Sequence, residues 1–328
     1  MTQASASLEK LVERHLPALL ALTRTVSCNF IDARTASKDV VRAVAQRHAG
    51  RPAAIPSAGE LLVSTCLRFE LYRYDGAGQP LAPFFHASGL TCVRRFLSMI
   101  TGLQSEIVGE QEILLQVSEA VRAGRRRNRL LEPAEQGFAA LLALGAAIRE
   151  HSGVDSHENY STTAADLIVS HVARGRGATV AIVGGGYMAE AFFSALLRAR
   201  FANVRHILWI NRSVAKLRRS LADVVELMEI PLDLLDLDEG SHALAEADAV
   251  FCALAASPGR YADAALRQNA FVVDVSYPPV FAPRPGMTLV NIANTDFSLI
   301  VRLPIAKSSI GQADRDIDDV IAFLEAAE

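Results

Sequence analysis

The stretch that decides the fold is Thr179-Val180-Ala181-Ile182-Val183-Gly184-Gly185-Gly186-Tyr187-Met188-Ala189. It begins as a short apolar run rich in β-branched residues, which is typical of a buried parallel strand, and its glycines indicate a tight turn. The residues that follow, 189–197, have helical character. Strand, glycine turn and helix match the G-x-G-x-x-G/A pattern of dinucleotide-binding domains, in which the pyrophosphate lies on the helix N-terminus.

Three positions of the glycine turn carry separate expectations. Gly184 makes the turn, Gly186 lets the backbone approach the pyrophosphate, and Ala189 permits close packing of the helix on the strand. We expect the cofactor to bind along the whole turn, at Gly184, Gly185, Gly186, Tyr187, Met188 and Ala189. The alternative is a glycine turn that binds nothing.

The next apolar run indicates which dinucleotide is bound. Residues 207–210 lie where the second strand of a βαβ unit should lie, and Asn211-Arg212-Ser213 follows them. An NAD site usually has an acidic residue at this strand end to bind the ribose 2′-hydroxyl. No acidic residue stands here, and Arg212 with Ser213 can hold a 2′-phosphate through charge-assisted hydrogen bonds. Asn211, Arg212 and Ser213 therefore favour NADP(H) over NAD.

Length and composition exclude several classes of protein. The 328 residues suggest two domains, and 51% hydrophobic with 21% charged residues is ordinary for a soluble globular protein. A net charge of −3 argues against a dedicated nucleic-acid coat, but not against a local basic patch. The four cysteines form no C-x-x-C pair, so neither a metal site nor a disulfide framework is indicated, and a reducing cytoplasm fits best. The longest apolar stretch, 138–148, is too short to cross a bilayer.

Periodicity divides the chain into a mixed half and a dinucleotide-binding half. The first 72 residues alternate between helical and strand patterns, which indicates a small α+β unit: helices over 8–22 and 37–48, strands over 23–30 and 60–63 leading into 64–72. Residues 89–152 then turn helical, interrupted by the basic run Arg125-Arg126-Arg127. That run can meet phosphates, or it is a solvated loop. Further elements are expected as a connecting helix over 161–172, strands over 249–254 and 271–275, and a final helix over 314–327.

Cys66 is the best candidate for a nucleophile. It follows an apolar strand in a Ser-Thr-Cys turn, and Arg68 stands two residues further on. A neighbouring guanidinium lowers the pKa of a thiol and raises its thiolate fraction at neutral pH. A single cysteine beside a strand is more often a small core residue, which is the alternative.

Two stretches of the first half carry a family resemblance. The segment Ser64-Thr65-Cys66-Leu67-Arg68-Phe69-Glu70-Leu71-Tyr72 resembles the nucleophile loop of glutamyl-tRNA reductases, Ser-Thr-Cys-Asn-Arg-Thr-Glu-Leu/Ile-Tyr. Residues 102–117 resemble that family's Gly-Leu-Asp-Ser-x-x-x-Gly-Glu-x-Gln-Ile-Leu-x-Gln-Val. The glycine turn, residues 211–213, Asp274-Val275-Ser276-Tyr277-Pro278 and Asn294-Thr295-Asp296 fit the same family, in order and spacing, from about residue 26 to 299.

The resemblance implies an α/β, V-shaped enzyme. Its catalytic domain, ferredoxin-like α+β plus helices, would cover 1–156, a connecting helix 157–177, a Rossmann NADP(H)-binding domain 178–300, and a tail helix 301–328 corresponding to the start of the family's spinal helix. Cys66 would attack the ester that joins glutamate to its tRNA, and hydride from NADPH would release glutamate-1-semialdehyde for tetrapyrrole (porphyrin) synthesis. Arg68 would grip the substrate carboxylate, and the resemblance assigns further substrate contacts to Thr65, Glu70, Arg95, Ser105, Glu110 and Gln116.

Several departures from the family pattern open alternatives. Leu67 and Phe69 replace the family's Asn and Thr, which would make the substrate pocket more apolar. Arg95 stands where the family has a helix histidine, and His86 is a candidate substitute acid or a structural residue. The alternatives are therefore a reductase of another aminoacyl-tRNA or a carrier-bound thioester, and a non-catalytic NADPH-binding regulator. A shikimate-dehydrogenase-like oxidoreductase would share the glycine turn but leaves the Cys66 loop unexplained.

The partners follow from the same resemblance. An aminoacyl-tRNA is the expected substrate, and an enzyme that consumes the aldehyde product is a further expected partner. The chain stops at Glu328, soon after the spinal helix would begin, so we expect no dimer through the family's usual domain. No membrane partner is expected.

Overall fold

The computed structural model describes residues 3–49, 59–65, 67–74, 80–127, 130, 132–156, 158–173, 177–200, 203–222, 228–254, 261, 264–276, 279–301 and 304–328. The chain forms two compact units. Unit 1 comprises Met1–His157 together with Leu303–Glu328, and unit 2 comprises Glu158–Arg302. None of the described helices is both long and apolar enough to cross a membrane.

Unit 1 is built on a four-stranded antiparallel sheet with the strand order β2-β3-β1-β4. Its strands are β1 (Ser27–Asp32), β2 (Glu60–Thr65), β3 (Arg68–Arg73) and β4 (Phe85–Ser88). Helix α2 (Lys38–Ala49) connects β1 to β2, and β3 lies between these two strands. This is the split βαβ arrangement of ferredoxin-like folds, so the predicted α+β class of the first half is confirmed.

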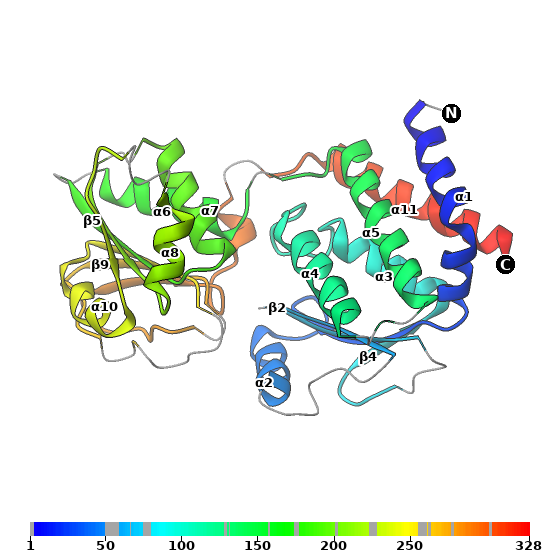
Figure 1. Cartoon of the computed structure of the whole chain (residues 1–328), viewed down its shortest axis with the longest axis horizontal. Helices are drawn as coiled ribbons and strands as arrows, with labels where there is room; N and C mark the ends of the chain where they lie inside the picture. Colours follow the sequence, from blue (N-terminus) through cyan, green and yellow to red (C-terminus); the bar gives the residue numbers. More distant parts are fainter. Residues whose placement is uncertain are drawn as a thin grey trace. The chain divides into compact units, whose positions relative to one another are not determined.

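Helices cover both faces of this sheet (Figure 1). On one face lie α1 (Gln3–Thr23), α3 (Gly89–Ile100), α4 (Glu112–Arg126), α5 (Ala134–Ser152) and α11 (Lys307–Ala327). Their apolar residues form one core with the sheet residues Cys28, Leu61, Val63, Tyr72 and Ala87. Helix α2 covers the other face, where Val41 and Val44 pack on Ile31 and Phe69.

The C-terminal helix belongs to unit 1 rather than forming a separate tail. Helix α11 begins at Lys307, earlier than the periodicity predicts, and packs against α1, α3 and α5. Its buried residues are Ala313, Asp316, Ile317, Val320 and Leu324. Asp316 pairs with His151 of α5, whose Nδ1 lies 2.8 Å from Oδ2. The chain therefore returns to unit 1 after it has completed unit 2.

Unit 2 has a six-stranded parallel sheet in the order β10-β9-β8-β5-β6-β7. Read from β7, this is the 3-2-1-4-5-6 order of the Rossmann fold, which confirms the predicted class. Its strands are β5 (Ala178–Val183), β6 (Val204–Ile210), β7 (Leu232–Leu235), β8 (Ala249–Cys252), β9 (Ala270–Asp274) and β10 (Met287–Asn291). The described helices are α6 (Tyr160–Val172), α7 (Tyr187–Arg198), α8 (Val214–Ser220) and α10 (Leu237–Ala243), with the 3-10 turns η2 (Leu244–Glu246) and η3 (Phe297–Leu299).

The connecting helix predicted before the glycine turn is α6, and it packs within unit 2. It contacts α7, β8 and β9, and the ring of His171 stacks on Phe271 with centroids 4.5 Å apart. The spacing of apolar residues does not predict β7 and β10, the two edge strands. Both expose part of their side chains, so neither carries the continuous apolar run that marks a buried parallel strand.

Candidate active site

The hairpin that joins β2 to β3 carries the predicted nucleophile. Cys66 itself lies outside the described residues, but its neighbours Thr65 and Arg68 form the last paired positions of the two strands. The backbone N–H of Ala33 donates to the carbonyl of Leu67 at 3.0 Å, which ties the hairpin to the chain leaving β1. The nucleophile loop therefore stands at the end of the sheet, directly before Arg68.

Strand alternation decides which residues of this loop lie together. Arg68 and Glu70 point to the face covered by α3, whereas Phe69 points to the α2 face and is 5% exposed. There Phe69 packs on Ile31 and on Phe84, with ring centroids 5.6 Å apart. The prediction that Phe69 makes the pocket beside Arg68 more apolar is therefore wrong, because its side chain lies on the opposite side of the sheet.

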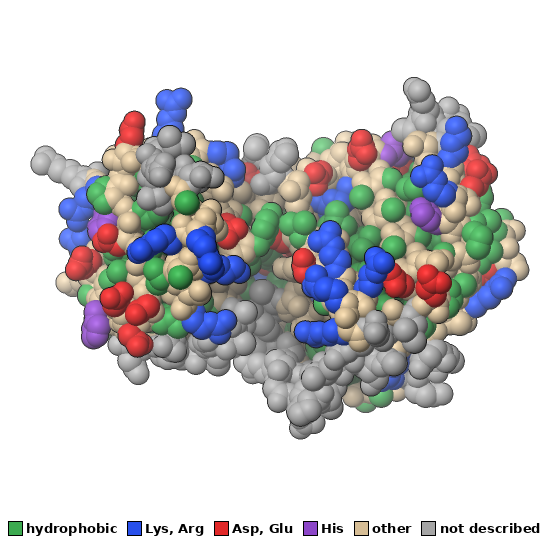
Figure 2. Space-filling model, viewed as in Figure 1, with side chains coloured by type: hydrophobic (Ala, Val, Ile, Leu, Met, Phe, Trp, Pro, Cys, Tyr) green, Lys and Arg blue, Asp and Glu red, His purple; other side chains and the backbone are tan. Residues whose placement is uncertain are grey.

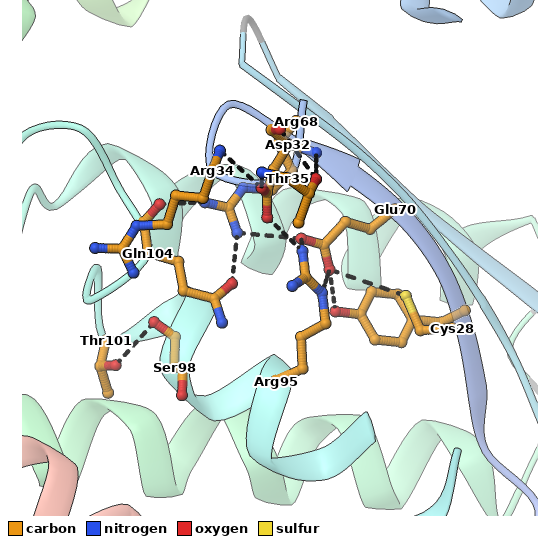
Figure 3. Close-up of polar contacts among 11 residues, drawn as sticks. Cys28, Asp32, Arg34, Thr35, Arg68, Glu70, Arg95, Ser98, Thr101 and Gln104 are labelled. Atoms are coloured by element: carbon orange, nitrogen blue, oxygen red, sulfur yellow. Dashed lines mark hydrogen bonds and ion pairs between the residues drawn. The ribbon is translucent and has the colours of Figure 1, made fainter. Parts of the chain in front are cut away.

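Glu70 is the centre of the polar cluster on the α3 face (Figure 3). Its side chain is fully buried. The carboxylate accepts hydrogen bonds from Arg68 Nη1 at 3.1 Å, from Arg95 Nη2 at 2.7 Å and from the hydroxyl of Tyr72 at 2.5 Å. A buried carboxylate is tolerated only when it is paired and hydrogen-bonded, and Glu70 meets both conditions. The structure therefore places Glu70 as a partner of Arg68.

Arg95 of α3 completes this cluster. Its Nη2 lies 2.6 Å from Oδ2 of Asp32, and its guanidinium carbon lies 3.3 Å above the ring centroid of Phe30. Burial alone would lower the pKa of Arg95, but the charges of Glu70 and Tyr72 and the hydrogen bonds to Asp32 and Glu70 together raise it above its ordinary value. Burial would likewise raise the pKa of Asp32, and the hydrogen bond and charge of Arg95 hold it below its ordinary value. The cluster thus balances two carboxylates with two guanidinium groups.

Arg68 is already engaged in this structure. It is 4% exposed, its Nη1 contacts Glu70, and its Nη2 donates to the backbone carbonyl of Gln104 at 3.1 Å. The Gln104 side chain also lies at 3.5 Å from Nη1. A substrate carboxylate that binds Arg68 in a bidentate manner must displace Gln104. Pattern reasoning missed this residue, although the family motif has Asp at its position.

His86 does not join the cluster. It lies on β4 directly opposite Asn29, and its Nδ1 is 3.4 Å from the Asn29 side-chain oxygen. The neighbouring pair, Phe85 and Phe30, points to the other face, where Phe30 lies under Arg95. Strand alternation places the His86 side chain on the face of the sheet opposite to Phe30 and Arg95, so the structure does not bring this candidate acid to the position of the family's histidine.

The loop between α3 and α4 brings two further predicted residues into unit 1's interior. Ser105 and Glu110 are 7% and 8% exposed, and Ser105 hydrogen-bonds the Glu110 carboxyl. Burial raises the pKa of Glu110 to about 7, against the opposing effects of Ser105 and Arg68. Gln116 is exposed on α4, and Thr65 is half-buried at the end of β2. Gln116 therefore lies on the surface, apart from the buried Glu70, Ser105 and Glu110 of the predicted substrate-binding set.

The basic run lies on a helix rather than in a loop. Helix α4 extends through Arg126, and Arg127 is its C-cap. Arg125 pairs with Glu135 at 2.8 Å, and Arg122 and Arg126 both lie near Glu119. Lys and Arg side chains gather over α4 on the face shown in Figure 2. Such exposed pairs contribute little stability, so these cations remain accessible to an anionic partner.

In unit 2 the three glycines of the turn meet different surroundings. Gly184 has φ +126°, and a Cβ there would lie 2.4 Å from the Ala253 carbonyl oxygen. A Cβ on Gly185 would lie 2.3 Å from the Asn211 side chain, whereas a Cβ on Gly186 would meet nothing within 4 Å. The indole N–H of Trp209 donates to the Gly184 carbonyl at 2.7 Å and holds the turn against β6. The turn is therefore packed on one side and open at Gly186.

The open side of the turn fits a dinucleotide phosphate. Gly186 is the N-cap of α7 and no side chain caps this helix, so its first turn can receive an anion. Ala189 is fully buried, and Tyr187 is 49% exposed. At the end of β6, Arg212 and Ser213 are exposed beside the turn, and Asn211 donates to the Ser213 carbonyl at 3.3 Å. The residues predicted to bind the cofactor therefore lie together at the carboxyl ends of strands β5 and β6.

Two shorter motifs of unit 2 have aspartate side chains that accept hydrogen bonds from the backbone of neighbouring loops. Asp274 ends β9 and accepts the backbone N–H groups of Val280 at 2.6 Å and Phe281 at 2.9 Å, which closes the loop after the strand. Asp296 caps the turn η3 through Ser298. Residues 277 and 278 of the first motif lie outside the described part of the chain. Both motifs thus shape loops around the sheet.

Comparisons with known proteins match each unit separately. The family model "Glutamyl-tRNAGlu reductase, N-terminal domain" matches residues 23–152, and the model "Shikimate / quinate 5-dehydrogenase" matches residues 166–296. The glutamyl-tRNA reductase of Thermus thermophilus is 30% identical over 253 residues, which are 72% of this chain and 62% of that protein. The glutamyl-tRNA reductase of Deinococcus radiodurans is 28% identical over 296 residues, 79% of each chain.

One solved structure covers nearly the whole chain. The glutamyl-tRNA reductase from Methanopyrus kandleri covers 93% of this chain and 80% of its own, with 20% sequence identity and a TM-score of 0.44. Against the Thermus relative, the present chain spans 62% of the relative's length.

Proposed function

The chain belongs to the glutamyl-tRNA reductase family, and we propose that it uses NADPH to reduce the acyl group of an aminoacyl-tRNA. Glutamyl-tRNA is the default substrate, and the product is then glutamate-1-semialdehyde, a precursor for tetrapyrroles. The observation that carries this proposal lies in unit 1: strand β3 begins at Arg68, two residues after Cys66 in the sequence, and Arg68 pairs with the fully buried Glu70.

The chemistry follows from the residue types. The Cys66 thiolate attacks the ester carbonyl, the bond between the acyl carbon and the ribose oxygen breaks, and a thioester forms. A thioester has little resonance stabilisation, so hydride can reduce it where a carboxylate would resist. Hydride addition to the acyl carbon is followed by cleavage of the carbon–sulfur bond, which releases the aldehyde and regenerates the thiolate.

Arg68 and its supports determine how the acyl group is held. The guanidinium can bind a carboxylate with two parallel hydrogen bonds once Gln104 moves aside. Glu70 pairs with both Arg68 and Arg95, so it holds Arg68 in place, and the arginine at position 95 cannot lose its proton to act as an acid. Arg95 therefore positions the substrate-binding arginine and leaves proton transfer to another group.

The residues at the carboxyl ends of β5 and β6 support NADPH as the cofactor. When bound, the nicotinamide supplies the hydride. Gly186 offers the open approach to the pyrophosphate, and the exposed Arg212 and Ser213 suit a 2′-phosphate, since no carboxylate stands at the end of β6 to repel it. The basic surface over α4 suits the phosphates of the tRNA.

The test is direct turnover. Purified protein, NADPH and each charged tRNA are combined while aldehyde formation and NADPH oxidation are followed. We expect turnover with glutamyl-tRNA and none with uncharged tRNA, and we expect Cys66→Ala to be inactive. Full activity of Cys66→Ala would contradict the thioester mechanism, and absence of turnover with glutamyl-tRNA would contradict the default substrate.

A second candidate is favoured by one specific observation. Both terminal nitrogens of Arg68 already have protein partners, and Gln104 stands where the family motif has Asp. A substrate without a side-chain carboxylate would leave these bonds intact. The alternative substrates are therefore another aminoacyl-tRNA or a carrier-bound thioester, and both are tested in the same aldehyde assay.

A non-catalytic NADPH-binding regulator is separated from both enzymes by alkylation. A nucleophilic Cys66 should react with iodoacetamide near neutral pH faster than free cysteine, because thiolates are the reactive form. Among the described cysteines, Cys28, Cys92 and Cys252 are buried, so selective labelling of Cys66 is expected. A Cys66 that reacts no faster than free cysteine would favour the regulator.

A further inference from the structure

Glu110 presents a buried carboxyl oxygen without a hydrogen-bond partner. The residue is 8% exposed, and its Oε2 has no partner among the described residues. Ser105 hydrogen-bonds the same carboxyl group. A buried, unpaired carboxyl oxygen is costly when charged and is uncommon in a purely structural role. It therefore requires an explanation in terms of function.

The loop that carries Glu110 is held rigidly. Gly102 and Gly109 both have φ +76°, and a Cβ on Gly109 would lie 2.0 Å from the Val154 carbonyl oxygen. The Gly109 carbonyl accepts hydrogen bonds from Arg149 Nη2 at 2.6 Å and from the backbone N–H of Ser156 at 2.9 Å. Glu110 is thus fixed by the backbone of the preceding residue.

The same loop rests on the site of the proposed chemistry. Gln104 contacts Arg68 through both its side chain and its carbonyl, and Arg68 lies two residues after Cys66. The charge of Arg68 acts on Glu110. The loop that carries Ser105 and Glu110 therefore contacts the substrate-binding arginine through Gln104, while Glu70 contacts it from the strand.

The charged groups around Glu110 are already paired with other residues. Arg149 of α5 binds Asp155 at 2.5 Å, and Arg68 of β3 binds Glu70 at 3.1 Å. Glu106 of the same loop, which opposes ionisation of Glu110, pairs with Lys38 of α2 at 2.5 Å. Because these neighbours are paired elsewhere, burial dominates and raises the pKa of Glu110 to about 7, so a substantial fraction of the carboxyl groups carries a proton near neutral pH.

The proposed reaction consumes one proton, and the charged cluster cannot supply it. Reduction of an ester by hydride gives an aldehyde and an alcohol, so the leaving ribose oxygen must be protonated. Arg95 stands at the family's histidine position and remains charged, and His86 lies on the far face of the sheet. A carboxylic acid on the loop that contacts Arg68 can take this role.

We propose that Glu110 is the proton donor to the ribose oxygen that leaves when Cys66 forms the thioester. The Glu110 O–H bond breaks as the carbon–oxygen bond of the ester breaks, which leaves an alcohol, a thioester and the Glu110 carboxylate. Solvent returns the proton after the products depart. This inference rests on the proposed function.

The test compares leaving groups that do and do not need a proton. Acyl transfer to Cys66 is measured in the full-length protein in a single turnover without NADPH, first with charged tRNA and then with the p-nitrophenyl ester of the same amino acid. We expect Glu110→Gln to slow transfer from the tRNA by roughly 10²- to 10⁴-fold. We expect transfer from the p-nitrophenyl ester to stay within about threefold of the wild type, because p-nitrophenolate leaves without protonation.

Three controls make the outcomes distinct. Glu9→Gln removes an exposed acid of α1, away from the basic surface of α4, and should leave both rates unchanged. The pH dependence of transfer from the tRNA should lose its decline above about pH 7 in Glu110→Gln, since that decline follows Glu110 ionisation. Iodoacetamide labelling of Cys66 should proceed at the wild-type rate.

Each possible result either supports or overturns the role of Glu110 as the proton donor. Equal losses with both substrates would mean a structural role for Glu110, and a wild-type rate of Glu110→Gln with charged tRNA would mean no role at all. Either outcome overturns this inference while leaving the proposed function intact. A wild-type protein that transfers no acyl group from any charged tRNA would overturn the proposed function, and the inference with it.

Discussion

The Arg95 guanidinium of α3 lies 2.7 Å from the buried carboxylate of Glu70 on β3. This bond joins the helical layer to the sheet and completes a row of alternating charges, Asp32, Arg95, Glu70 and Arg68. The residue that departs from the family's histidine is therefore integrated into the interior, where it neutralises two carboxylates. Loss of a titratable group at this position is accompanied by a gain in fixed charge.

Removal of Arg95 should destabilise unit 1 strongly. Arg95→Met leaves Asp32 and Glu70 with one fewer counter-charge in a buried place, and breaking one side of a buried ion pair costs about 3–5 kcal/mol. The free energy of unfolding is measured by urea denaturation. The matched control is Arg94→Met, whose partner Asp318 is 57% exposed, and a surface pair of this kind contributes less than about 1 kcal/mol. Equal losses in the two variants would show that the cluster is not a stabilising centre.

The charge state of Glu110 should make stability depend on pH. Its pKa is raised from 4.5 to about 7 in the folded protein, so the folded state holds more protons than the unfolded state between these values. Stability from this group is present below about pH 4.5 and is lost as the pH rises through about 7. Relative to Glu110→Gln, the wild type should lose about 3 kcal/mol over that range. Urea unfolding of both proteins from pH 4.5 to 8 measures the difference, and a constant difference would contradict the raised pKa.

Substitution of Gly184 should impair folding, whereas substitution of Gly186 should impair cofactor binding. Gly184→Ala strains a backbone at φ +126° and brings a Cβ against Ala253, so it should lower the melting temperature of unit 2. Gly186→Ala meets no neighbouring atom and should fold normally, but its methyl group enters the space for the pyrophosphate. NADPH affinity of Gly186→Ala, measured by fluorescence titration, should fall about tenfold or more, which is ~1.4 kcal/mol. Unchanged affinity would place the pyrophosphate elsewhere.

Arg212 should determine the preference for NADPH over NADH. Arg212→Gln removes the exposed cation at the end of β6, and a hydrogen bond to a charged group contributes about 1.5–3 kcal/mol. We expect NADPH to bind roughly 10- to 100-fold more weakly, while NADH affinity stays unchanged because NADH lacks the 2′-phosphate. Arg205→Gln, an exposed arginine at the opposite end of β6, is the control. Parallel losses for both cofactors would contradict a 2′-phosphate contact.

Phe69 should affect stability rather than substrate choice. Phe69→Thr restores the family residue but removes a ring from the α2 cluster, so we expect a loss of about 3 kcal/mol. Acyl selectivity, measured as the ratio of aldehyde formed from two charged tRNAs, should not change. Leu67→Asn, in the hairpin next to Cys66, is the variant expected to alter that ratio. A shift in selectivity with Phe69→Thr would place its side chain in the substrate pocket.

Local patterns in the sequence were sufficient to predict much of the architecture. The glycine turn between β5 and α7, the helices of unit 1 and the central strands of unit 2 all follow from the spacing of apolar residues and glycines. Buried central elements carry continuous or periodic apolar runs, so the spacing of apolar residues predicts whether each is a helix or a strand. The half-exposed edge strands β7 and β10 carry no such run, and only pairing with a neighbour makes them strands.

The candidate site divides in the same way. The sequence by itself determined the residue types: Cys66 before Arg68, an arginine at position 95, and no acid after β6. Tertiary structure decided which of them meet. It placed Phe69 and His86 across the sheet from Arg68, brought Gln104 onto that arginine and buried Glu110. The reason is physical: alternation assigns each strand residue to a face, but only the packed helices α2 and α3 decide what each face contains.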